Sequence, residues 1–86
     1  FYSLEQNYPN PFNPSTIINF NLAKSGFTSL KIYDVIGNEV AVILNKELEA
    51  GPYQIAFDAA NLPSGVYMYT INSGSFTETM KMMLLK

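Results

Sequence analysis

The chain has 86 residues, of which 48% are hydrophobic and 14% charged, so it can bury one small core but not two. Five lysines, no arginine and seven acids give a net charge of −2, which leaves no basic patch for nucleic acid. Without histidine or cysteine, the chain cannot form a Ser-His-Asp or Cys-His catalytic site, a disulfide or the usual zinc site. We therefore expect no enzyme activity, no metal, no cofactor and no small-molecule substrate.

The first 15 residues predict a stiff lead-in rather than a central strand. Three prolines within six positions remove three backbone N–H donors and favour extended conformations for the residues before them. The segment is either a stiff loop pinned by Tyr8 and Phe12 onto the end of the domain or a preformed recognition surface. A short strand is expected within it, around Tyr2–Leu4.

Residues 16–86 predict an all-β domain. The five glycines stand beside other turn-forming residues, 9 to 14 residues apart, which is the turn spacing of a β-sandwich or barrel and too short for βαβ units. Between the turns, hydrophobic and polar residues alternate, as in half-buried antiparallel strands. Strands are expected at residues 16–22, 27–34, 39–44, 53–58, 66–72 and 75–85. The sequence thus predicts an immunoglobulin-like antiparallel β-sandwich of about seven strands.

The alternation also predicts which side chains point inward. Ile18, Phe20 and Leu22 share one face, as do Leu30 and Ile32. The same rule places Val40, Val42 and Leu44 together, and Tyr53, Ile55 and Phe57 together. Residues 40–50 also fit one or two helical turns, but the flanking glycines favour a strand followed by a loop. Gly37 and Gly65 are expected at turns that need a positive φ.

Three further segments have a structural and a functional interpretation. Asp34 and Glu39 close a predicted hairpin, and two carboxylates alone are weak evidence for a cation site. Ser64 has no base to activate it. Tyr67 and Tyr69 share a face and either stack on a sugar ring or pack in the core. The tail from Met80 to Lys86 is either the closing strand or an end that a partner reads.

The sequence closely resembles the type A C-terminal sorting domain of the bacterial type IX secretion system, found in Bacteroidetes and related phyla. The matching segments are NYPNPFNPSTIINF at 7–20, LKIYDVIGNEV at 30–40, AGPYQIAFD at 50–58, NLPSGVYMYTI at 61–71 and MKMMLLK at 80–86. Domains of this family are immunoglobulin-like sandwiches attached to diverse secreted proteins. The resemblance implies one sorting domain over residues 1–86, with a lead-in at 1–15 and a sandwich at 16–86.

The resemblance also implies the function and its partners. An upstream cargo protein would be exported to the periplasm, directed through the outer-membrane translocon, and processed by a sortase-like protease at the cell surface or released outside. The residues that match the family motifs, and that we expect to be recognised, are Pro9, Asn10, Pro11, Gly65, Tyr67, Lys81 and Lys86. The start at Phe1 fits a piece of a larger precursor.

Two other kinds of module stay open on the residues alone. A carbohydrate-binding module would need a flat row of exposed aromatic side chains, for which Tyr33, Tyr53, Tyr67 and Tyr69 are the candidates. A structural or adhesive module would normally recur along the chain, and the sequence contains no internal repeat.

Overall fold

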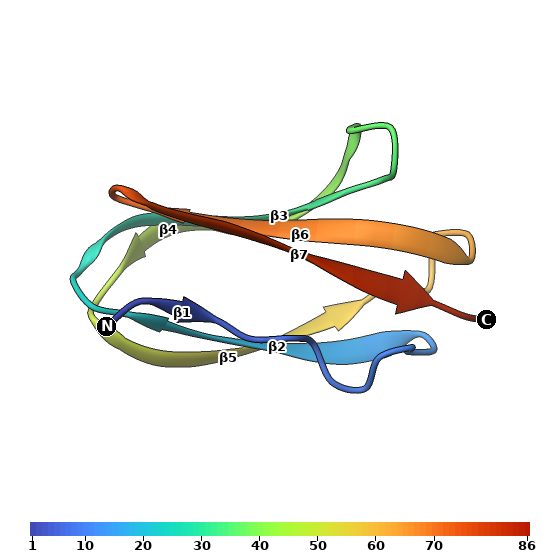
Figure 1. The fold of residues 1–86 in the computed structure, drawn as a ribbon, viewed down its shortest axis with the longest axis horizontal. Coiled ribbons are helices and arrows are strands. Elements are labelled where there is room, and N and C mark those ends of the chain that lie inside the picture. The colour runs from blue at the N-terminus through green and yellow to red at the C-terminus, as the bar shows by residue number, and fades with distance from the viewer.

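The computed structural model describes all 86 residues, which form seven strands. Their bounds are β1 (Ser3–Leu4), β2 (Ser15–Leu22), β3 (Gly26–Tyr33), β4 (Glu39–Leu48), β5 (Gly51–Asp58), β6 (Gly65–Ser73) and β7 (Phe76–Leu84). Two antiparallel sheets face each other, one in the order β1-β2-β5 and one in the order β4-β3-β6-β7 (Figure 1). The predicted seven-stranded β-sandwich is confirmed. None of the chain forms a helix that could cross a membrane.

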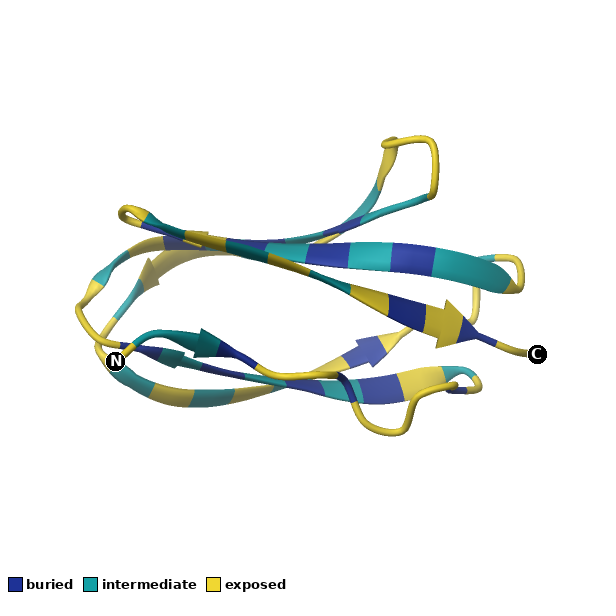
Figure 2. Cartoon of the chain, viewed as in Figure 1, coloured by how far each residue is buried: buried dark blue, intermediate teal, exposed yellow.

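The core lies between the two sheets and follows the predicted alternation. Buried and more exposed residues succeed one another along β2, β3 and β6 (Figure 2). The predicted inward rows of β2, β3 and β5 are all confirmed, as is the inward position of Met82 and Leu84 on β7. The buried hydrophobic residues are Leu4, Phe12, Ile18, Phe20, Leu22, Leu30, Ile32, Phe57, Ala59, Tyr67, Tyr69, Ile71, Met82 and Leu84.

Strand β4 differs from the prediction in length and in orientation. It continues to Leu48, so that both the helical alternative and the loop after Leu44 are wrong. Leu30 pairs with Leu44 but Lys31 pairs with Val42, which leaves Ile43 as an extra residue, and a second irregularity follows before Tyr33. Such bulges shift the alternation by one residue. Val42 therefore points outward and is 48% exposed, instead of sharing the inward face of Leu44.

The lead-in crosses from one sheet to the other. Tyr8 exchanges two backbone hydrogen bonds with Ile17 of β2, and four residues later Phe12 pairs in parallel with Leu84 of β7. The Phe12 side chain is buried, as predicted, but the Tyr8 side chain is 78% exposed, so only its backbone is held. Cis peptide bonds precede all three prolines of the lead-in. The lead-in thus ties the two sheets together along one side of the sandwich.

Candidate functional site

The predicted recognition residues, which are far apart in sequence, gather around the C-terminal half of β7. On one side β7 pairs with β6, where Gly65 lies opposite Leu84 and Tyr67 opposite Met82. On the other side it contacts the lead-in segment that contains Pro9, Asn10 and Pro11. Lys81 and Lys86 belong to β7 and to the residues that follow it.

The lead-in is bound to the free edge of β7 by four hydrogen bonds, one of them from the Gln6 side chain to the Lys81 carbonyl. The Phe12 N–H donates to the Met83 carbonyl, and the Leu85 N–H donates to the Phe12 carbonyl, both at 3.0 Å. The Met83 N–H donates to the side-chain oxygen Oδ1 of Asn10 at 2.9 Å. The end of β7 is therefore held from both sides, by β6 and by the lead-in.

Tyr67, one of the predicted recognition residues, lies mostly inside this region. Its ring is 5% exposed, and its hydroxyl donates to the Pro63 carbonyl at 2.6 Å, across the turn that precedes β6. Gly65 begins β6 with a φ of +158°, close to fully extended. The predicted positive φ is present at both glycines: Gly65 lies at the extended limit of that range, and Gly37, with a φ of +91°, lies well within it.

The two lysines differ in what they contact. The Lys81 side chain is exposed and forms no ion pair, while its carbonyl accepts a hydrogen bond from Gln6 at 2.8 Å. The Lys86 ammonium donates to the Ala60 carbonyl at 2.5 Å, and its backbone N–H donates to Ser64 Oγ at 2.9 Å. Lys86 thus connects the tail to the turn before β6, and Lys81 presents an unpaired positive charge.

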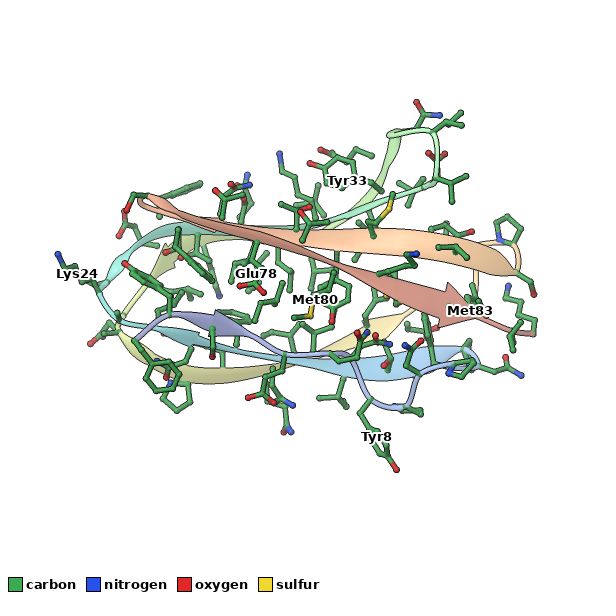
Figure 3. All side chains as sticks on the ribbon, viewed as in Figure 1. Tyr8, Lys24, Tyr33, Glu78, Met80 and Met83 are labelled. Atoms are coloured by element: carbon green, nitrogen blue, oxygen red, sulfur yellow. The ribbon has the colours of Figure 1, made fainter.

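Exposed hydrophobic side chains accompany these charges. Met83 is 38% and Leu85 is 52% exposed (Met83 is labelled in Figure 3). They alternate with the buried Met82 and Leu84, so Met83 on β7 and Leu85 directly after it continue the outward row that Lys81 begins. No pocket opens beside them, so any partner that reads this row must supply the concave surface.

Sequence reasoning missed a buried polar cluster that anchors the lead-in. The Asn7 side chain, 2% exposed, donates to the carbonyl of Pro9 and to the hydroxyl of Thr16. The Asn7 N–H donates to the Tyr69 hydroxyl at 2.8 Å, and this hydroxyl donates to the Glu5 carbonyl at 2.6 Å. The sequence feature that could have indicated this cluster is Asn7, a polar residue at the start of a segment whose prolines limit backbone hydrogen bonding.

A family model of the secretion system C-terminal sorting domain matches residues 6–85. The chain belongs to this family. Its fold is similar to that of PorZ, described as an essential bacterial surface component of the type-IX secretion system of Porphyromonas gingivalis, with a TM-score of 0.60 and 19% identity. The similarity covers 99% of this sorting domain and 11% of the PorZ chain. A search of the curated proteins finds no match.

The acidic side chains of the β3–β4 hairpin are engaged within the sorting domain. Oδ1 of Asp34 accepts hydrogen bonds from the N–H groups of Ile36 and Asn38, at 3.1 and 2.9 Å. Glu39 forms an ion pair with Lys31 at 3.4 Å. Nowhere do three His, Cys, Asp or Glu side chains form a group that could hold a metal ion. Both carboxylates therefore contact groups of the hairpin itself.

The tyrosines do not form the flat row that a carbohydrate-binding sheet would need. Tyr67 and Tyr69 are buried. Tyr33 is only partly exposed, on the outer face of the larger sheet, and partly buried Tyr53 stacks on Phe20 with ring centroids 5.2 Å apart. These positions favour packing over sugar stacking.

Proposed function

We propose that this sorting domain directs a protein attached upstream of it across the outer membrane through the type IX secretion system. Its partners are the translocon, a sortase-like protease and the upstream cargo domain. The route leads through the periplasm to the cell surface or the medium. Membership of the sorting-domain family over residues 6–85 supports a role as a secretion signal.

The observation that carries the proposal is the meeting of the sorting motifs around one strand end. The lead-in, the start of β6 and the tail come from three parts of the chain and contact one another through β7. One partner surface can therefore contact all three at once. Its chemistry should combine an apolar groove for Met83 and Leu85 with a carboxylate for Lys81, because that lysine is unpaired.

The same region offers no arrangement for catalysis. The hydroxyl of Ser64 accepts the backbone N–H of Lys86, and the chain has no histidine to act as its base. We therefore propose a signal that acts by binding and performs no chemistry of its own.

A secretion assay tests the proposal. The domain is fused behind a signal peptide and a reporter, and expressed in a host with a working type IX system. The parent fusion should reach the surface or the medium, whereas a fusion without the last seven residues should accumulate in the periplasm. The double variant Lys81→Ala/Lys86→Ala should also be retained if the lysines contact the translocon.

Two controls separate recognition from folding. The double variant Lys24→Ala/Lys46→Ala removes the same charge from exposed positions outside the tail and should be secreted like the parent. The purified lysine variants should melt within a few degrees of the parent, since surface changes typically cost less than about 0.5 kcal/mol. A parent fusion retained in the periplasm of the competent host would overturn the proposed function. Normal secretion of a well-folded Lys81→Ala/Lys86→Ala variant would move the recognition surface away from the two lysines.

A further inference from the structure

On the outer edge of β7, the backbone N–H of Met83 is hydrogen-bonded to a side chain, that of Asn10, and not to the backbone of another strand. β7 is the last strand of its sheet, so the N–H and C=O groups on its outer edge have no neighbouring strand. The lead-in supplies partners for Met83 and Leu85, and the Met83 N–H is bonded to Oδ1 of Asn10. An edge strand otherwise leaves such groups open to water or to another chain.

The Asn10 side chain accepts a bond that the parallel pairing of Phe12 with Leu84 would otherwise give to a backbone carbonyl. Phe12 and Leu84 form a parallel pair, in which the bonds slant from one residue to the neighbours of its partner. Continued by one step, this ladder would join the Met83 N–H to the backbone carbonyl of Asn10. The side-chain oxygen Oδ1 of Asn10 accepts that bond instead. The Asn10 side chain therefore extends the hydrogen bonding between the lead-in and β7 by one bond, at the point where the proline-rich chain leaves the strand.

The Asn10–Met83 hydrogen bond holds the backbone at the centre of the outward-facing row of Lys81, Met83 and Leu85. Met83 presents its side chain outward between Lys81 and Leu85, while its backbone N–H is fixed by Asn10. Without that bond, Met83 keeps only its carbonyl bond to Phe12 on this edge. Loss of an edge bond allows local opening of a strand end without unfolding of the domain.

We propose that Asn10 is a positioning residue, which acts on recognition through β7 and does not itself contact the translocon. The inference rests on the proposed function and changes the role of Asn10 within it. The side-chain oxygen of Asn10 holds the Met83 amide, so that Lys81, Met83 and Leu85 are presented as one straight row. The early motif and the tail then form a single composite signal.

Three variants of the 86-residue chain test the contact directly by amide hydrogen exchange. Asn10→Ala removes the acceptor, and the Met83 amide should exchange about tenfold faster. Asn10→Asp keeps an oxygen at the same position and should restore the protection. Asn13→Ala is the matched control. Asn13 also precedes a proline and is exposed, but its side chain forms no hydrogen bond within the chain. This variant should leave the Met83 amide unchanged. An unchanged rate in Asn10→Ala would overturn the assigned contact.

The same variants in the secretion assay test the role. Asn10→Ala should lose surface reporter and gain periplasmic reporter, while Asn10→Asp and Asn13→Ala should match the parent. If Asn10→Asp restores protection but not secretion, a partner reads the Asn10 amide itself and the positioning role is wrong. It is also wrong if Asn10→Ala exposes the Met83 amide yet is secreted normally. Retention of the parent fusion would instead overturn the proposed function, and the exchange experiment would still decide whether Asn10 holds Met83.

Discussion

The hydroxyl of Tyr69 lies 2.8 Å from the backbone nitrogen of Asn7 and accepts its hydrogen. Tyr69 belongs to β6, at the centre of the larger sheet, whereas Asn7 belongs to the lead-in, 62 residues earlier in the chain. The same hydroxyl donates to the Glu5 carbonyl. A single buried side chain thus fixes the path of the lead-in between the two sheets, and the contacts of that segment with β7 depend on this path.

The first prediction concerns the pH dependence of stability. Burial, together with the negative charge of Glu78, raises the pKa of Tyr69 to about 12, although the Asn7 hydrogen bond acts in the opposite direction. Above pH 10 the unfolded chain loses this proton while the folded chain keeps it, so stability falls as the pH rises from 10 to 12. The free energy of unfolding should decrease by about 1 kcal/mol between pH 10 and 11 from this group alone. Urea titrations at a series of pH values measure the decrease.

The variant Tyr69→Phe is the control for this pH dependence. At neutral pH it should be less stable by about 1–3 kcal/mol, because the Asn7 N–H and the Glu5 carbonyl lose a buried partner. Between pH 10 and 12 its stability should fall less steeply than that of the parent. Equal slopes in the two proteins would show that Tyr69 does not control the alkaline decrease.

The second prediction concerns a pair of buried hydroxyl groups. Thr28 and Ser73 lie 2.9 Å apart on neighbouring strands and are almost fully buried. Thr28→Val should destabilise the domain by about 1–3 kcal/mol, because it leaves the Ser73 hydroxyl without this partner in the core. The double variant Thr28→Val/Ser73→Ala should cost less than the sum of the two single changes. Chemical denaturation of the four proteins gives the coupling free energy.

A second hydroxyl pair in the same sheet serves as the control. Thr70 and Thr79 lie 2.8 Å apart, but on the solvent-facing side of the sheet. Water can replace that bond, so Thr70→Val should change stability by less than about 0.5 kcal/mol. Similar losses from Thr28→Val and Thr70→Val would mean that burial does not determine the cost.

Local alternation predicted most of the sandwich because it depends only on neighbours in the chain. On β2, Ile18, Phe20 and Leu22 point inward as their spacing requires. The rule failed at Val42, because a bulge depends on how two strands pair, and no feature of residues 39–48 alone shows where the extra residue falls.

The candidate site depended on two kinds of information. Motif resemblance supplied the residues, including Asn10 and Lys81, but could not say which of them contact each other. The Asn10–Met83 hydrogen bond joins residues 73 positions apart, so it exists only after the sandwich has formed. Resemblance alone also does not distinguish a buried side chain such as Tyr67 from an exposed one such as Lys81.

The third prediction concerns the turn between β3 and β4. Gly37 has a φ of +91°, and its N–H donates to the Asp34 carbonyl at 3.1 Å. Gly37→Ala should therefore cost about 1–3 kcal/mol of stability through backbone strain. Gly26→Ala is the control, since Gly26 is not in a positive-φ conformation and an added Cβ would meet nothing within 4 Å. Thermal melts in which both variants lose the same stability would contradict the assignment of strain to the Gly37 turn.

The last prediction separates the two faces of β7, which carry the core and the proposed signal. Leu84 is fully buried, whereas its neighbour Met83 is 38% exposed. Leu84→Ala should cost about 2–5 kcal/mol, because it removes core contacts and leaves a cavity. Met83→Ala should cost less than about 1 kcal/mol, since it keeps the backbone bond to Asn10 and removes no buried side chain.

If Leu84→Ala proves too unstable to measure, Leu84→Val gives a smaller loss of stability of about 1 kcal/mol. Urea unfolding monitored by tyrosine fluorescence measures each change. Equal losses from the alanine variants at positions 83 and 84 would contradict the inward and outward assignment on which the proposed recognition row of Lys81, Met83 and Leu85 depends.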